Sequence, residues 1–174
     1  MKKFIALALG AILCLGLLAA CGTPAASTTP SPEPALTGEA LAQHYKDAIT
    51  AGRTEQDNTD RPINYTGDDA DMTMVWELLG VTADQLDAYA LSISLMNVQA
   101  YCVGLFKPVS GQEDAVLTAI QTYQDNIEQS FSSYLPDQYE IAQSAKVEQL
   151  SDGTVAIVMC ADAANVYDAI VAAL

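Results

Sequence analysis

Basic residues and histidine are scarce in this 174-residue sequence. It has seven Lys and Arg against 22 Asp and Glu, and a formal net charge of −15. Because a chain this acidic has no basic surface to bind phosphates, we expect no nucleic-acid partner. The charge is expected either to keep the protein soluble or to form a cation-binding surface. The single histidine, His44, cannot build a His-rich zinc site, and we expect it at the surface.

The sequence also lacks the patterns of several common chemistries. It contains no Gly-x-Gly-x-x-Gly, no Gly-Lys-[Ser/Thr], no Gly-x-Ser-x-Gly and no Cys-x-x-Cys. Asp69-x-Asp71-x-Thr73 begins like a calcium loop, but Met74 stands where the sharp turn needs glycine. The carboxylate pair Glu113-Asp114 is better explained as a helix N-terminus. We therefore predict that the protein is not an enzyme and has no metal site and no cofactor.

The N-terminus is the most informative stretch. Lys2 and Lys3 precede an apolar run from Phe4 to Leu18, and small residues lead to Cys21. A basic start, a short apolar run and a small-residue cleavage site make a signal peptide. The apolar run is shorter than the ~20 residues of a spanning helix. The pattern Leu18-Ala19-Ala20-Cys21 resembles the lipobox of a bacterial lipoprotein precursor.

That resemblance implies cleavage between Ala20 and Cys21 and attachment of acyl chains, such as palmitate, to Cys21. The alternatives are an ordinary secretory signal with a chance cysteine, or an uncleaved anchor. Cleavage would leave 154 residues with five basic and 22 acidic side chains, a net charge of −17. Anionic lipid heads would repel such a chain, so the acyl chains would supply the membrane attachment. The predicted location is the outer face of the cell membrane.

Four parts of the chain follow from these patterns. Residues 1–20 are the predicted signal peptide, and residues 21–36 are the lipidated cysteine with a Pro/Ser/Thr-rich tether. Residues 37–88 hold a helix near 38–51, a long acidic loop over 52–71 and a segment around Trp76. Residues 89–174 are the predicted core domain. The first helix has an apolar stripe of Leu41, Tyr45, Ala48 and Ile49.

The core domain is predicted to have ββαββα order. A period-two pattern indicates a strand near 89–95, and further strands are predicted near 100–107, 146–150 and 154–160, with a two-residue turn at Asp152-Gly153 between the last two. Ser110 and Glu113 match a capping box before a helix to about 135, and Asp162 is expected to cap a last helix. The predicted class is α+β, a two-layer sandwich in which both helices cover one side of a four-stranded, mainly antiparallel sheet. An N-terminal helix precedes it. The two ββα halves look alike, which suggests an internal duplication.

The first strand predicts a place for binding. Leu91, Ile93 and Leu95 alternate with the small residues Ala90, Ser92 and Ser94. If the first three form the helix-side core, Ser92 and Ser94 lie on the other face of the sheet. That strip is either a binding face for an envelope partner or the docking surface of the N-terminal helix or the Trp76 segment.

Cysteine use adds one expectation. After Cys21 the chain keeps only Cys102 and Cys160, both in strand-like apolar runs. Lone strand cysteines usually behave as small buried hydrophobes, so we predict free thiols rather than a disulfide.

Two short stretches carry a resemblance to a known family. The run from Tyr89 to Val98 (Tyr-Ala-Leu-Ser-Ile-Ser-Leu-Met-Asn-Val) and the run from Phe131 to Tyr139 are similar to Gram-positive lipoproteins grouped as domain-of-unknown-function family 4358. The resemblance covers about residues 74–174. It implies the outer face of a single membrane and no assigned activity. We expect a membrane-anchored, non-enzymatic binding module at the cell envelope, with an envelope protein as possible partner. The alternative is an extracytoplasmic enzyme or small-ligand-binding lipoprotein with an acidic site, and a deep pocket with convergent polar groups would favour it.

Overall fold

A four-stranded antiparallel sheet organises the structure, a computed structural model that describes residues 35–66 and 72–174. Its strand order is β1-β2-β4-β3, and each neighbouring pair is antiparallel. The strands are β1 (Leu86–Ile93), β2 (Cys102–Pro108), β3 (Lys146–Gln149) and β4 (Val155–Met159). This confirms the predicted α+β class, the four strands and their order along the chain.

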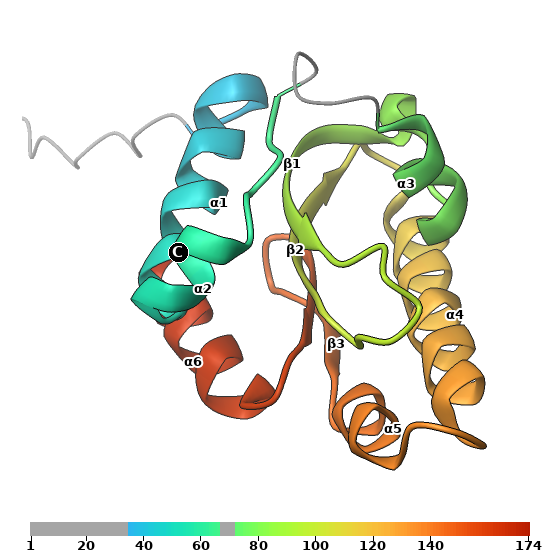
Figure 1. Ribbon diagram of the computed structural model, residues 1–174. Coiled ribbons are helices and arrows are strands. Elements are labelled where there is room, and N and C mark those ends of the chain that lie inside the picture. The colour runs from blue at the N-terminus through green and yellow to red at the C-terminus, as the bar shows by residue number, and fades with distance from the viewer. Residues whose placement is uncertain (1–34, 67–71) are drawn as a thin grey trace, which may run out of the picture. The chain divides into compact units, whose positions relative to one another are not determined.

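Helices cover both faces of this sheet (Figure 1). The elements on one face are α1 (Gly38–Gly52) and α6 (Ala163–Ala173), with α2 (Glu55–Asp60) beside them. Those on the other face are α3 (Thr73–Leu79), α4 (Glu113–Phe131) and α5 (Pro136–Gln143). A short 3₁₀ turn, η1 (Ala83–Gln85), leads into β1. Residues 35–174 form one compact unit.

Each face has its own apolar core. Large side chains fill the α4 face, where Phe106 and Ile157 from the sheet meet Val116 and Ile120 from α4. The α1 face combines the small sheet residues Ala88, Ala90 and Ala156 with larger ones such as Leu105, beneath α1 and α6. Small side chains let a helix backbone approach a sheet closely, and at Gly52 α1 comes close to α6.

The predicted two-layer arrangement is therefore wrong, because α4 and α6 lie on opposite faces. The same finding contradicts the duplication hypothesis. Only a two-fold axis perpendicular to the sheet could relate the antiparallel neighbours β2 and β4. Such an axis would place the helix after each strand on the same face. The likeness of the two halves reflects the shared pattern of ββα units.

The N-terminal helix forms as predicted. Leu41, Tyr45, Ala48 and Ile49 are all buried on the inner side of α1. The loop predicted over 52–71 is partly wrong, because it contains α2. The side chain of Thr54 accepts a hydrogen bond from the Asp57 backbone and so caps this polar helix. The loop then returns to the sheet, where Asn64 makes an isolated antiparallel bridge to Leu91 and covers the edge of β1.

Three local predictions differ from the structure. β1 ends at Ile93, so Leu95, expected in the core, lies in the following loop and is 54% exposed. Ser110 does not cap α4: Gln112 is the N-cap residue, and Glu113 accepts a hydrogen bond from the backbone of Gly111. The β3–β4 turn has three residues, 151–153, closed by the hydrogen bond from Leu150 N to Thr154 O.

Several predictions fall outside the described residues. They include the signal peptide 1–20, cleavage at Ala20, the lipid on Cys21 and most of the tether 21–36. Asp69 and Asp71, which begin the sequence that resembles a calcium loop, also lie outside. Over 35–66 and 72–174, no helix is both long and apolar enough to cross a membrane.

Candidate functional site

The candidate site is an apolar pocket beside the first half of α1. It has a volume of about 820 Å³, within the roughly 300–1,000 Å³ typical of small-ligand sites. Apolar side chains make most of its wall: Leu36, Leu41, Leu150, Val171 and Leu174. Polar side chains enter it at a few points: His44, Tyr45, Asp87, Lys107 and Asp152.

Parts of the chain that are distant in sequence build this pocket. The helical spacing of Leu41 and Tyr45 places both on one side of α1. The β3–β4 turn supplies Leu150 and Asp152, and the end of α6 supplies Val171. The exposed fractions of Val171 and Leu174 are 38% and 40%, so their apolar surfaces are open to a ligand.

A chain of hydrogen bonds runs along the polar side of the pocket. The hydroxyl of Thr154 donates to Asp152 Oδ2 at 2.7 Å, so its oxygen accepts from the hydroxyl of Tyr45 at 2.6 Å. Lys107 Nζ donates to the Asp152 carboxylate at 3.3 Å and to its backbone carbonyl. The order is therefore Tyr45 to Thr154 to Asp152, with Lys107 on the same carboxylate.

The protonation states follow from this chain. Burial is the main reason that the pKa of Tyr45 rises to about 12, against the lowering effect of its bond to Thr154. Tyr45 therefore stays protonated at neutral pH and is not a general base. Burial would raise the pKa of Asp152, but hydrogen bonds from Thr154 and the charge of Lys107 outweigh it and lower that pKa. Asp152 stays ionised, so the polar chain holds its protons in place.

Asp87 enters the site through a β-bulge. The register with β2 shifts between Leu86 and Ala88, so Asp87 is the extra residue of β1. Leu86 packs on the α4 face and Ala88 on the α1 face, although they are two residues apart. The bulge thus places Asp87 beside α1, where its Oδ2 accepts a hydrogen bond from Gly38 N at 3.1 Å. Within the part of the chain that the structure describes, neither ion pair involves Asp87.

A second, smaller hollow adjoins Asp87 on the other side. Its volume is about 360 Å³, and its lining includes Gly38, Glu39, Tyr65 and Tyr89 together with Asp87. Within residues 35–66 and 72–174, the charged groups that line it are two carboxylates, those of Glu39 and Asp87. A cation nevertheless lies close by, because Lys46 Nζ is 4.3 Å from the centre of the Tyr65 ring.

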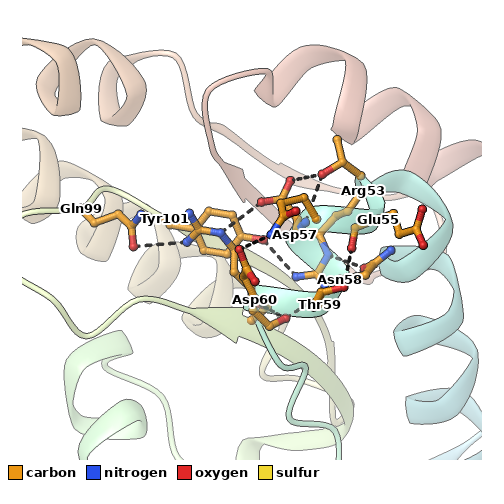
Figure 2. A network of polar contacts seen from close by, with 12 residues as sticks. Arg53, Glu55, Asp57, Asn58, Thr59, Asp60, Gln99 and Tyr101 are labelled. Carbon is orange, nitrogen blue, oxygen red and sulfur yellow. Dashed lines mark hydrogen bonds and ion pairs between the residues drawn. The ribbon is translucent and has the colours of Figure 1, made fainter.

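The far end of α1 is closed by a polar network (Figure 2). Arg53, which is 8% exposed, donates to Asn58 Oδ1, to the hydroxyl of Tyr101 and to the carbonyl of Arg61. Arg61 lies over the Tyr101 ring at 3.8 Å and pairs with Asp57 at 3.1 Å. Both arginines thus hold the α1–α2 segment to the start of β2. Burial raises the pKa of Tyr101, although the bond from Arg53 opposes this effect.

The predicted binding face at Ser92 and Ser94 does not form as an open strip. Ser92 is 1% exposed, and its hydroxyl donates to the carbonyl of Arg61 at 3.3 Å. Ser94 is half-buried, and its hydroxyl accepts from the backbone of Met96. The face of the sheet on which Ser92 lies is covered by α1 and the segment after it. This is the alternative given above, in which the N-terminal helix docks on that face.

The remaining candidates lie apart from one another. His44 is half-buried at the pocket, where its Nε2 lies 3.2 Å from the carbonyl of Leu174. Cys102 is buried on the α4 face, whereas Cys160 packs against the α1 face. Both are free thiols, and a bond between opposite faces of a sheet would require the backbone to move. Burial raises the pKa of both thiols, so neither is an activated nucleophile. Among the described residues no cluster of three or more metal-binding side chains occurs.

Sequence reasoning missed Asp87, Lys107 and Thr154 as site residues. The Asp152-Gly153 turn was recognisable, but its side-chain partners were not, because they come from other strands. A bulge leaves only a faint signal: in β1 the acidic Asp87 interrupts the alternation beside Leu86.

A family profile matches residues 63–170 of this chain, and the family is described as a domain of unknown function (DUF4358). The chain belongs to this family. No match was found among curated proteins or among solved structures. The matched range includes all four strands and most of α6, while α1 and the arginine of its C-cap, Arg53, precede it.

Proposed function

We propose that this DUF4358 protein is a lipoprotein held on the outer face of the cell membrane by acyl chains on Cys21, and that its folded domain is a non-enzymatic binding module of the envelope. The pocket of about 820 Å³ beside α1 carries the second half of this proposal. Its walls are mostly apolar, and a few polar groups converge on it, as is typical of ligand sites. The occupant is an apolar group, either of a small envelope component or of a partner protein.

The polar groups of the pocket support binding rather than catalysis. Tyr45 keeps its proton at neutral pH, and Asp152 is engaged by Thr154 and Lys107. A catalytic pair would need a nucleophile within hydrogen-bond reach of a base. The acidic rim at Asp87 supports the ligand-binding form of the alternative hypothesis, in which an acidic site takes a small ligand.

The anchoring is tested by changing Cys21 to Ala in the native host. Acylation needs the thiol, so we expect the variant in the soluble fraction or as an unprocessed precursor. Fractionation followed by mass determination of the chain measures this. Cys160→Ala is the matched control and should remain membrane-bound. Recovery of mature, tightly membrane-bound Cys21→Ala protein would overturn the lipoprotein proposal.

The pocket is tested with a neutral apolar probe, decanol. The protein is the mature chain with Cys21→Ala, so that no acyl chain competes. We expect calorimetric binding of decanol and loss of at least about tenfold in affinity in Val171→Asp, which puts a charge on the apolar wall. Val171 is 38% exposed, so this change should leave the melting temperature nearly unchanged. Equal binding by the two proteins would overturn the pocket as the site.

A further inference from the structure

The two hollows beside Asp87 differ in character and share one carboxylate. The larger is walled mostly by apolar side chains, whereas the charged groups that line the smaller one, among the described residues, are the carboxylates of Glu39 and Asp87. Asp87 lines both, because the bulge in β1 places it on the α1 face at the mouth of the larger pocket. An apolar pocket and an acidic one that share Asp87 in their walls are together complementary to a molecule with an apolar tail and a cationic head.

We propose that the site binds single-chain amphiphiles with a cationic head group. This inference rests on the proposed function, since it names the ligand class of the same pocket. The tail lies among Leu41, Val171 and Leu174, and the head group lies against the carboxylate of Asp87, in the hollow that Glu39 also lines.

The charges around the pocket favour this polarity. Lys107 is paired with Asp152, and the carboxylate offsets the attraction of this ammonium for an anionic head. Asp87 uses Oδ2 for the backbone N–H of Gly38, which leaves Oδ1 for a ligand. The N–H at the start of α1 would itself attract an anion, but the carboxylate of Asp87 already occupies that position. The net charge of −15 adds a long-range field that attracts cations and repels anions.

Two other surfaces are candidate ligand sites, and neither combines a pocket with a charge that lacks an ion-pair partner. The arginine network at the other end of α1 has its polar atoms engaged with one another. The exposed loop of Leu95, Met96 and Val98 is apolar, but nothing indicates what covers it. Asp87 alone combines an unpaired charge, a bulge that directs it and a cavity beside it.

The test compares three probes with one tail: decylammonium, decanol and decyl sulfate, each below its micelle concentration. The protein is again the mature chain with Cys21→Ala, and calorimetry gives the dissociation constants at low salt. We expect decylammonium to bind about tenfold more tightly than decyl sulfate, with decanol between them, because Asp87 attracts one head and repels the other. High salt should reduce this ratio.

Asp87→Asn is the decisive variant, because an amide oxygen can still accept from Gly38 N. The ratio of decyl sulfate to decylammonium dissociation constants should fall from about ten towards one, while decanol binding is retained. Asp168→Asn removes an equal charge from an exposed position on α6 that lines neither hollow, and it should keep the ratio.

The outcomes separate this inference from the proposal beneath it. Equal affinity for all three probes, or tighter binding of decyl sulfate, overturns the cationic head while the pocket stands. An unchanged ratio in Asp87→Asn, or an equal fall in Asp168→Asn, overturns the role of Asp87. Failure of all three probes to bind, decanol included, overturns the pocket itself.

Discussion

The two ends of α1 lie on the same face of the same sheet, yet they differ in how space is filled. At the N-terminal end, Leu41 and Tyr45 border a cavity of about 820 Å³. At the C-terminal end, the side chain of Arg53 lies between α2 and the start of β2 and donates hydrogen bonds to both sides. Throughout the described residues, no buried side-chain polar atom lacks a partner. The hydrogen-bonded network around Arg53 holds the end of α1 in place. The pocket at the other end, lined by the carboxylate of Asp87, is available to a ligand.

The contrast has a physical basis in the sheet below. Beneath α1 the strands present Ala88, Ala90 and Ser92, so the helix can lie close to the backbone. Near Gly52 it also lies against α6, and the gap is closed there. Towards Gly38, by contrast, the pocket lies between the start of α1, the β3–β4 turn and the end of α6. The C-terminal end of α1 is therefore tightly packed, whereas its N-terminal end borders a pocket.

Among changes to α1 itself, the largest effect is expected at the C-terminal end, where Arg53 lies. Arg53→Met removes four hydrogen bonds and leaves Asn58 Oδ1 and the Tyr101 hydroxyl without this donor. Buried polar groups left unsatisfied are costly, so we expect the free energy of unfolding to fall by about 2–4 kcal/mol. Urea unfolding measures it.

Lys146→Met is the control for Arg53→Met. It removes the same charge from the edge strand β3, and its cost should stay within about 0.5 kcal/mol. If both variants lose the same stability, the network around Arg53 does not fasten α1, and the comparison between the two ends fails.

The next effect tests how closely α1 approaches α6. A methyl group at Gly52 would lie 2.4 Å from Ile170 Cγ1 and 3.1 Å from its backbone nitrogen. Overpacking of this kind typically costs about 1–3 kcal/mol, which outweighs the roughly 1 kcal/mol that alanine adds to a helix. We expect Gly52→Ala to be destabilised on urea unfolding by the difference.

A double-mutant cycle isolates that contact. Ile170→Ala alone leaves a cavity and should cost about 2–5 kcal/mol. With the Cγ1 atom gone, the shortest contact of the added methyl of Gly52→Ala is removed, so the double variant should lose less than the sum of the two changes. Simple additivity would show that the two helices are not in close contact at Gly52.

These elements show how far the sequence predicts the fold. The period of Leu41, Tyr45 and Ile49 predicts α1 and its buried side, and the alternation after Tyr89 predicts β1. Such patterns identify which residues are buried but not which face of a sheet they cover. The placement of α6 opposite α4 therefore could not be predicted, although both helices were.

The errors at Leu95 and Ser92 have physical causes of the same kind. Alternation extends to Leu95, but the strand stops at Ile93 and the chain turns into an exposed loop. Ser92 is polar and small, which favoured a solvated face, and the carbonyl of Arg61 instead satisfies its hydroxyl in the interior. One buried hydrogen bond from a distant residue reverses the expectation that composition gives.

The pocket depended on still more distant contacts. Tyr45 and Thr154 are separated by 109 positions and meet only because α1 crosses the sheet above the β3–β4 turn. Asp87 reaches the α1 face through one extra residue in a strand. Neither feature has a period, so no window of sequence reports it.

The smallest predicted effect returns to the N-terminal end of α1. Tyr45→Phe removes the hydroxyl that donates to Thr154, while Thr154 keeps its own bond to Asp152. One such hydrogen bond contributes about 1 kcal/mol, so the loss at pH 7 should be of that size and below the loss in Arg53→Met. Urea unfolding again measures it. The control is Tyr134→Phe, which removes a hydrogen bond to the Asn97 carbonyl from an exposed ring and should therefore cost less.

The pH dependence gives Tyr45→Phe a sharper signature than its stability at pH 7. Burial raises the pKa of Tyr45 from 10.0 to about 12, so the fold favours the neutral phenol. The resulting stability is fully present below pH 10, the unfolded value, and is lost as the pH rises through about 12. Wild type should therefore lose about 1 kcal/mol more than Tyr45→Phe between pH 9 and pH 11. Tyrosines common to both proteins, such as Tyr101, cancel in this difference. Equal losses in the two proteins would mean that the Tyr45 hydroxyl is open to water through the pocket, and that the polar chain behind it does not hold its proton.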